Sequence, residues 1–192
     1  MTKKPDSRAR RWPIRQAAAT LRSGGVIAYP TEAVYGLGCD PLNIDAVLHL
    51  LGIKRRDPAK GLILVADDIR RLLPFIDITD AQRHTLMQSW PGPHTWLVPA
   101  QDWVPAWLTG RHDSLAVRVS AHPLVAALCR EAQMPIVSTS ANLAGHPPAR
   151  NALQARRNLA GQVDFFLTGK TGGHNRPTTI RDLRSGRLIR AS

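Results

Sequence analysis

Four cationic side chains fall within the seven residues of the segment 54–60 (KRRDPAK). Arginine presents a planar fork of N–H donors and lysine a compact charge, and both suit phosphate oxygens. Cations at a helix end can also simply offset the helix dipole. That alternative accounts for Lys54 and Arg55 but not for Lys60, which follows a proline. The segment therefore favours a phosphate-binding site.

Two further polar clusters follow apolar runs. Segment 138–142 (STSAN) comes after PIV, and its hydroxyl and amide groups suit phosphate, ribose or amino-acid atoms at close range. Segment 29–32 (YPTE) comes after VIA, and loops at the carboxyl ends of strands are where α/β proteins bind ligands. The alternative for both is an ordinary turn or a helix cap made by small polar residues.

Arg118 lies inside the strand-like segment AVRVS. A buried cation among apolar neighbours requires an anionic partner. Arg118 is therefore either a clamp for a carboxylate or an ordinary strand residue that faces solvent.

Several familiar catalytic patterns are missing from the sequence. Gly169-Lys170-Thr171 resembles the end of a phosphate-binding loop, but Asp164 occupies the position of the required earlier glycine. No HExxH, GxSxG or paired-cysteine motif occurs. The seven histidines have no metal-ligand spacing, so we assign no protein ligands to a metal. His94 and His174, in Pro/Gly-rich turns, are the histidines hardest to dismiss as packing residues.

The elements that must position these residues alternate along the chain. Apolar runs bounded by Gly and Pro predict strands, and apolar residues at helical spacing predict helices. The expected strands cover 26–30, 61–66, 90–100, 114–120, 135–142 and 163–169, and a final hairpin turns at Ser185-Gly186. The expected helices cover 14–22, 44–54, 79–89, 122–132 and 151–161. Residues 31–41 are expected to form a loop, and Ile44, Val47, Leu48 and Leu51 to face the core. This order predicts a single α/β domain with a mixed sheet.

The composition and net charge indicate which ligands and which cellular compartment suit the protein. The 192 residues carry a formal charge of +12, which favours polyanionic ligands such as nucleotides, RNA or anionic lipid, although a basic surface can serve solubility alone. Two distant cysteines suit a reducing compartment, and no stretch nears the length of a membrane span. We expect a cytoplasmic protein with no membrane association, a flexible basic arm over 1–13 and one domain over 14–192.

Five segments together resemble the YrdC/TsaC family of threonylcarbamoyl-AMP synthases: YPTEAVYGLGCDP, KRRDPAKGLILVA, WPGPHTWLVPA, SLAVRVSAHPLV and PIVSTSANLAGHPP. The resemblance implies a twisted, mixed parallel and antiparallel sheet flanked by helices, with a basic concave surface. It implies synthesis of threonylcarbamoyl-AMP and pyrophosphate from L-threonine, bicarbonate and ATP. It also implies partner proteins that transfer the threonylcarbamoyl group to tRNA beside the anticodon. Mg²⁺ bridging the phosphates is expected on general grounds.

The resemblance also implies roles for individual residues. Lys54 and Arg56 match its K-x-R pair and take the catalytic role. The implied ATP contacts are Lys54, Arg56, Lys60, Ser114, Ser140, Asn142 and Arg190. The implied threonine contacts are Thr31, Arg118, Ser138 and Thr178. The chain departs from longer relatives at Lys60-Gly61-Leu62, where they have Asn-Pro-Leu, and at Val65, where they have a histidine.

Two other functions fit parts of this pattern. The first is a non-catalytic RNA-binding or ribosome-maturation factor, although no common RNA-binding signature occurs. The second is an accessory domain of a larger carbamoyltransferase. ATP consumption that requires both threonine and bicarbonate distinguishes the synthase from either.

Overall fold

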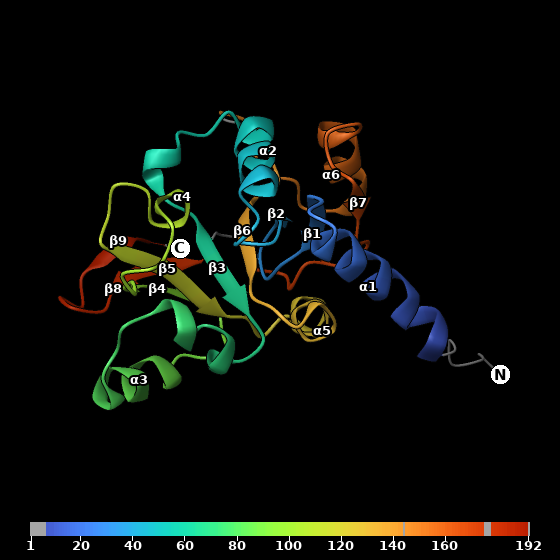
Figure 1. Cartoon of the computed structure of the whole chain (residues 1–192). Coiled ribbons are helices and arrows are strands. Elements are labelled where there is room, and N and C mark those ends of the chain that lie inside the picture. Colours follow the sequence, from blue (N-terminus) through green and yellow to red (C-terminus); the bar gives the residue numbers. More distant parts are fainter. Residues whose placement is uncertain (1–6, 144, 175–177, 192) are drawn as a thin grey trace.

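The computed structural model describes residues 7–143, 145–174 and 178–191, which form an α/β domain around one mixed sheet. Its nine strands lie in the order β7-β1-β2-β6-β3-β5-β4-β8-β9 (Figure 1). The pairs β1–β7, β3–β5 and β4–β8 are parallel, and the other neighbours are antiparallel. The predicted mixed α/β architecture is therefore confirmed.

The strands are β1 (Ile27–Pro30), β2 (Tyr35–Gly38), β3 (Ile63–Ala66), β4 (His94–Pro99), β5 (Ser114–Val119), β6 (Ile136–Ser140), β7 (Phe165–Phe166), β8 (Thr179–Asp182) and β9 (Leu188–Arg190). The α-helices are α1 (Ser7–Arg22), α2 (Ile44–Lys54), α3 (Asp80–Met87), α4 (Ala106–Thr109), α5 (Pro123–Ala132) and α6 (Ala152–Leu159). Short 3₁₀ helices cover Pro58–Lys60, Ile69–Arg71 and Leu73–Phe75.

The alternation of β5 divides the domain into two faces. Successive residues of a strand point to opposite sides of a sheet. Leu115, Val117 and Val119 are buried in the larger core, which α2, α3 and α6 help to cover. Ser114 and Arg118 belong to the opposite face. The polar residues of this strand are therefore presented away from the main core.

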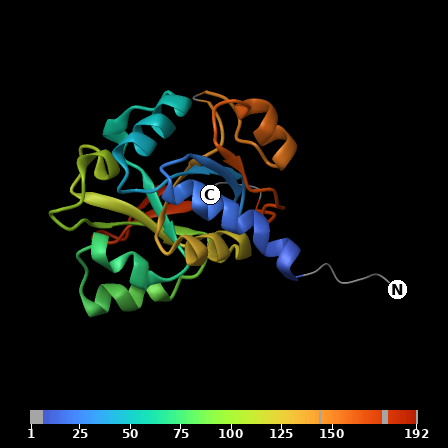
Figure 2. The same cartoon turned by 45° about the vertical axis from the view of Figure 1, so that its right-hand side comes forward.

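Helices cover only one end of that second face. Helices α1 and α5 pack against each other and bury Val65 and Tyr29 (Figure 2). The register of β3 with β5 places Arg118 beside Val65, and Ala116 beside Ile63. The second face therefore has a covered end at Val65 and Tyr29 and an open end beyond Ile63.

The segment expected to be a loop after β1 contains a strand instead. Residues 35–38 form β2, which pairs with β1 and β6. The glycines that predicted a loop make room here: a Cβ on Gly38 would lie 2.7 Å from the Val137 carbonyl oxygen and 2.8 Å from the Tyr29 ring. Glycine is needed in this strand because a neighbouring backbone and an aromatic ring approach it closely.

The predicted helix starts are largely confirmed. Asn43, Thr79 and Asn151 cap α2, α3 and α6 through their side chains. The final hairpin turns at Gly186 between β8 and β9, as expected. Helix α1 begins at Ser7, however, so it includes part of the segment expected to be a flexible arm. None of the helices in the described ranges is both long and apolar enough to cross a membrane.

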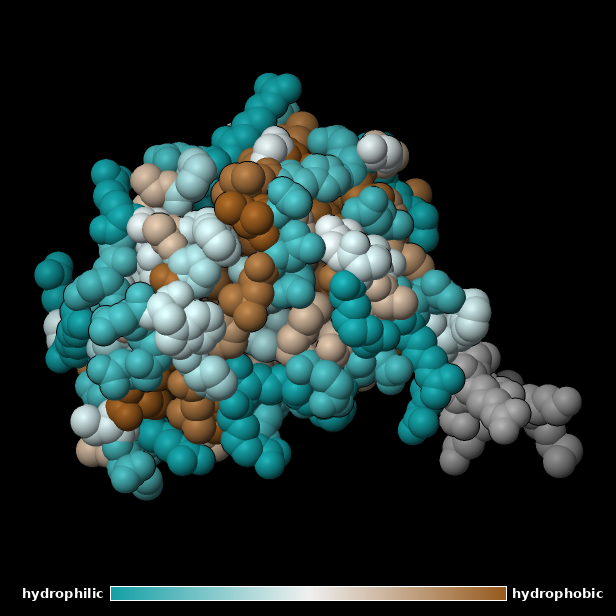
Figure 3. All heavy atoms as spheres, viewed as in Figure 1, coloured by the Kyte–Doolittle hydropathy of each residue, from teal (hydrophilic) through white to brown (hydrophobic). Residues whose placement is uncertain are grey.

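The buried face of α2 differs from the prediction. Val47 and Leu51 are buried as expected, but Ile44 and Leu48 are 44% and 52% exposed. The helix is turned so that Leu50 enters the core in their place. Apolar atoms, in brown, reach the surface in the upper middle of Figure 3, where Figure 1 places α2. The helix is apolar on more than one side, so spacing alone did not determine its orientation.

Candidate active site

A pocket of about 550 Å³ occupies the open end of the second sheet face. Ala116 on β5, Ile63 on β3 and Ser138 on β6 lie side by side along it, as the strand register dictates. The predicted site residues that line the pocket are Thr31, Arg56, Lys60, Ser114, Arg118, Ser138, Ser140, Thr178 and Arg190. Lys54 and Asn142 lie behind this lining and contact Ser140.

Four positively charged side chains converge on the pocket. Arg56, Lys60, Arg118 and Arg190 line it, and its described lining contains no aspartate or glutamate. The Arg190 guanidinium turns inward, where Nη2 donates to the Thr178 carbonyl at 2.9 Å. Partial burial, followed by the neighbouring Arg118 and Arg56, lowers the pKa of Arg190. The guanidinium groups are therefore close enough to repel one another, and an anion between them relieves that repulsion.

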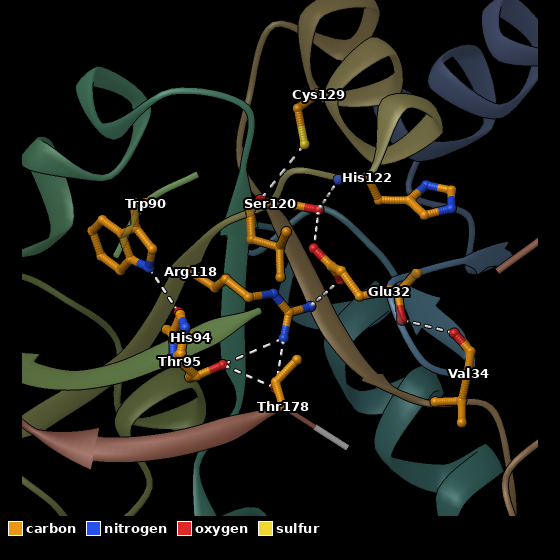
Figure 4. A network of polar contacts seen from close by, with 12 residues as sticks. Glu32, Val34, Trp90, His94, Thr95, Arg118, Ser120, His122, Cys129 and Thr178 are labelled. Atoms are coloured by element: carbon orange, nitrogen blue, oxygen red, sulfur yellow. Dashed lines mark hydrogen bonds and ion pairs between the residues drawn. The ribbon is translucent and has the colours of Figure 1, made fainter. Parts of the chain in front are cut away.

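Arg118 is buried, not solvent-facing, with 4% of its surface exposed. Its Nη1 donates to the Thr178 hydroxyl at 2.9 Å and to the Thr95 hydroxyl at 3.3 Å. Its Nη2 lies 3.5 Å from Glu32 Oε2. Figure 4 shows the guanidinium between the two threonines and the carboxylate. The anionic partner that its burial requires is supplied by the chain itself.

Glu32 is a site residue that the sequence did not single out by itself. Its Oε1 accepts a 2.6 Å hydrogen bond from the Ser120 hydroxyl. Burial acts to raise the pKa of Glu32, but Arg118 and the Ser120 hydroxyl outweigh it and lower the pKa overall. Glu32 is therefore a charged carboxylate beside Arg118, outside the described lining of the pocket. The sequence indicated such a carboxylate indirectly, because a buried Arg118 requires an anionic partner.

The loop after β6 is tied to the end of α2 by Lys54. The Lys54 ammonium lies 2.5 Å from the Ser140 carbonyl, 2.8 Å from the Asn142 carbonyl and 3.0 Å from Asn142 Oδ1. Arg55, the C-cap of α2, has a left-handed backbone with φ of 47°. The chain turns there, so that Lys54 reaches the loop while Arg56 reaches the pocket.

His94 and His174, which the sequence alone could not readily assign to packing, do not line the pocket. His94 Nδ1 lies 3.1 Å from the Thr179 hydroxyl, which ties β4 to β8. His174 is exposed, and its backbone N–H bonds the Glu32 carbonyl. The histidine that lines the pocket is His112. Within the described ranges, no three His, Cys, Asp or Glu side chains are grouped so as to hold a metal ion.

A twisted mixed sheet with a cation-rich pocket at the open end of one face defines an α/β protein whose pocket is suited to anions. Comparison with known families is more specific. The chain belongs to the Sua5–YciO–YrdC family, whose model, described as "Telomere recombination", matches residues 19–192. The recognition made from the five sequence segments is thereby confirmed.

Similar curated proteins cover nearly the whole chain. A protein named threonylcarbamoyl-AMP synthase from Xanthomonas euvesicatoria is 54% identical over 180 residues, which is 92% of this chain and 96% of that protein. A protein of the same name from Xanthomonas campestris is 54% identical over 177 residues, covering 91% and 95% of the two chains.

Solved structures show the same fold. P. abyssi Sua5, crystallised in complex with L-threonine, is 32% identical with a TM-score of 0.87 over 94% of this chain. This chain spans about half of the P. abyssi protein, 54% of its length. E. coli YciO is 26% identical with a TM-score of 0.83, covering 97% of this chain and 90% of that one.

Proposed function

We propose that this protein is a threonylcarbamoyl-AMP synthase, which makes L-threonylcarbamoyladenylate and pyrophosphate from L-threonine, bicarbonate and ATP. The observation that carries the proposal is the pocket, which gathers four cations, a row of hydroxyls and no acid in its described lining. The names of the two curated relatives described above support this activity over a non-catalytic RNA-binding role.

The buried end of the pocket suits threonine. Thr31, Ser138 and Thr178 are each less than one tenth exposed, and all three line the pocket with Arg118. Arg118 is proposed to hold the substrate carboxylate as a charge-assisted hydrogen-bonding fork. The small hydroxyls are suited to the side-chain hydroxyl of threonine. The L-threonine complex of the P. abyssi relative supports an amino-acid subsite in this fold.

The outer end suits a triphosphate. Arg56, Lys60 and Arg190 line it, and Lys60 and Arg190 are exposed to solvent. Three cations in a lining whose described residues include no aspartate or glutamate are suited to the charge of ATP. Ser114 and Ser140 offer hydroxyl groups along the same wall and are proposed to contact the nucleotide.

The reaction brings two anions together. The amine nitrogen of threonine bonds to the bicarbonate carbon, and water leaves to give a carbamate. A carbamate oxygen then bonds to the α-phosphorus of ATP as the bond to the bridging oxygen breaks, which releases pyrophosphate. Arg56 and Arg118 neutralise the reacting anions and hold them in line, and such positioning and electrostatic stabilisation supply much of the rate in reactions of this kind.

Magnesium and the later steps extend the proposal. Mg²⁺ is expected to travel with the triphosphate and to take most of its ligands from phosphate oxygens and water. The product is expected to pass to proteins that transfer its threonylcarbamoyl group to tRNA, with or without direct tRNA binding by this chain. Both ATP and tRNA are abundant in the cytoplasm, where we expect the enzyme to act.

The direct test is to incubate the protein with ATP, Mg²⁺, labelled bicarbonate and threonine and to detect a labelled adenylate by mass. We expect product only when both threonine and bicarbonate are present. Arg56→Met should abolish it, whereas Arg70→Met, which changes an exposed arginine paired with Asp68 outside the pocket, should not. ATP hydrolysis without adenylate, or RNA binding without any nucleotide turnover, would contradict the proposal.

A further inference from the structure

The surroundings of Lys54 do not match those of a phosphate ligand. Lys54 is 5% exposed and is not part of the pocket lining. An ammonium group has three N–H donors. Three oxygens lie within 3.0 Å of Lys54 Nζ, namely the carbonyls of Ser140 and Asn142 and the Asn142 Oδ1 atom. All the donors of the ammonium are therefore in use within the protein.

Asn142 is saturated in the same way. Its Oδ1 accepts from the Ser140 hydroxyl at 2.6 Å as well as from Lys54. Its Nδ2 donates to the carbonyls of Leu143 at 3.0 Å and His146 at 2.6 Å. The amide holds the two ends of this turn together and leaves no group for a nucleotide.

The contacts connect two segments that are far apart in the sequence. Ser140 and Asn142 follow β6, while Lys54 ends α2, which is anchored in the main core by Leu50 and Leu51. Only Ser140 of this trio lines the pocket. The rigid helix thus holds the pocket wall from behind.

We propose that Lys54 is a positioning residue, which clamps the loop 140–142 so that Ser140 faces the pocket, and that it does not bind the triphosphate itself. Asn142 is the other half of the clamp. The clamp rests on contacts within the protein alone, and its consequence for ATP rests on the proposed function.

The oxygens around Lys54 are neutral, which distinguishes a clamp from an ion pair. Burial, and then the Arg56 guanidinium, lowers the pKa of Lys54 to about 8. The structure therefore retains a buried cation with no carboxylate beside it, and such a group is expensive unless hydrogen bonds satisfy it. Its three close acceptors do so.

The first test uses the ligand-free protein. Amide hydrogen exchange would be measured at Ala141, His146 and Ala149, whose N–H groups bond other carbonyls in and around the loop. We expect Lys54→Met to accelerate this exchange about tenfold to a hundredfold, which matches the loss of hydrogen bonds to a charged group. Arg56→Met removes a neighbouring cation that faces the pocket and should leave the exchange unchanged. Equal exchange in the wild type and Lys54→Met would overturn the clamp.

Two further variants keep this test informative. Should Lys54→Met fail to fold, Asn142→Ala opens the clamp from its other side and should accelerate the same amides, and unchanged exchange there would equally overturn the proposal. Lys54→Cys, alkylated with 2-bromoethylamine, recreates a lysine-like ammonium and should restore slow exchange. The treated wild type controls for reaction at Cys39 and Cys129, both of which are buried. Failure of the ammonium to restore slow exchange would count against a charged clamp.

The second test asks how the clamp affects ATP. Residues of one network have non-additive effects. Lys54→Met and Asn142→Ala should each weaken ATP binding. The double variant should have the same affinity for ATP as whichever single variant binds ATP less tightly. The fold-losses in ATP affinity caused by Lys54→Met and by Arg56→Met should instead multiply when the two substitutions are combined. Losses that multiply for Lys54 and Asn142 would show that Lys54 touches the nucleotide directly. A wild type that binds no ATP would refute the proposed function, while the exchange result would still decide the clamp.

Discussion

Replacing Glu32 by glutamine tests the electrostatic account of the pocket most directly. The change keeps the shape of the side chain and removes the charge that faces Arg118. Each of the two side chains is 5% exposed, so water cannot replace the lost partner. Removing one member of a buried ion pair costs about 3–5 kcal/mol because the remaining charge stays buried.

The structure places Glu32→Gln at the lower end of that range. The amide oxygen of glutamine can still accept the 2.6 Å hydrogen bond from Ser120, and Arg118 keeps its bonds to Thr95 and Thr178. We therefore expect a loss of about 3 kcal/mol in the free energy of unfolding. For a chain of this size, that loss lowers the midpoint of thermal unfolding by about 6–12 °C.

The pKa of Glu32 determines how the stability difference between the wild type and Glu32→Gln should change with pH. The pKa of Glu32 is lowered in the folded protein, so its carboxylate contributes stability above the unfolded value and loses that contribution as the pH falls through the folded value. Thermal unfolding of the wild type and Glu32→Gln would be followed by circular dichroism from neutral pH downward. The difference between them should be full at pH 7 and should shrink in acid.

A matched control separates burial from simple pairing. Asp113 lies only 2.6 Å from Arg184, closer than Glu32 is to Arg118, but both side chains are more than half exposed. Exposed pairs contribute little because water screens them. Asp113→Asn should therefore leave the midpoint almost unchanged. The reasoning is refuted if Glu32→Gln and Asp113→Asn shift the midpoint equally, or if the effect of Glu32→Gln persists undiminished in acid.

Three further outcomes follow from the geometry. Arg118→Met should raise the KM for threonine about tenfold to a hundredfold in a synthase assay, as the loss of a charged hydrogen bond predicts. The control Arg70→Met should leave this KM unchanged. An unchanged KM in Arg118→Met would contradict the proposal that Arg118 holds the substrate carboxylate. Gly38→Ala should destabilise the fold by about 1–3 kcal/mol in urea unfolding because its Cβ meets a carbonyl oxygen at 2.7 Å. Gly52→Ala, with no atom within 4 Å of the new Cβ, should instead stabilise α2 by about 0.5–1 kcal/mol. The opposite order of stabilities would be inconsistent with close packing at β2. The pKa of Lys54 is lowered to about 8 from 10.5, so the unfolded state binds more protons between these values. The free energy of unfolding should therefore rise with pH over that interval, a rise that Lys54→Met should lack.

Local patterns predicted the elements whose packing agrees with them. The alternation of SLAVRVS predicted β5, and the polar residues at its alternate positions indeed occupy one face. Helices were predicted from residues 79 and 151, and Thr79 and Asn151 cap α3 and α6 there; such starts show in the sequence because a cap is a contact between neighbours along the chain. The sheet order could not be predicted in the same way, since β6 pairs with β2 and β3 across long stretches of chain.

Errors arose where a distant contact overrides the local signal. The glycines of 35–38 predicted a loop, but their function is to accommodate Tyr29 and the backbone of β6. On α2, Ile44 and Leu48 matched helical spacing, yet the core takes the neighbouring apolar side. In both segments the sequence is compatible with two structures, and the choice depends on what packs against it.

Residue type and position in the sequence predicted which residues gather at the pocket, and the roles of these residues stay predictions. Most line one pocket, because the strand register brings the ends of β3, β5 and β6 together. Glu32 was missed as a partner of Arg118 because no local pattern shows that a polar residue in a turn is buried. Lys54 and Asn142 were expected at the nucleotide, but their contacts are with each other and with Ser140.

These contacts divide the cations of the site into two groups. Arg118 and Lys54 are buried and already have partners, a carboxylate for the first and neutral oxygens for the second. Arg56, Lys60 and Arg190 line the pocket with no acid in its described lining. The first group fixes the shape of the pocket, and the second creates its attraction for anions. In the proposed synthase, a substrate carboxylate must therefore compete with Glu32 for Arg118, whereas a triphosphate meets positive charge that no acid of the described lining offsets. We therefore expect the amino acid to be recognised chiefly through shape and exchange of partners, and the nucleotide chiefly through charge.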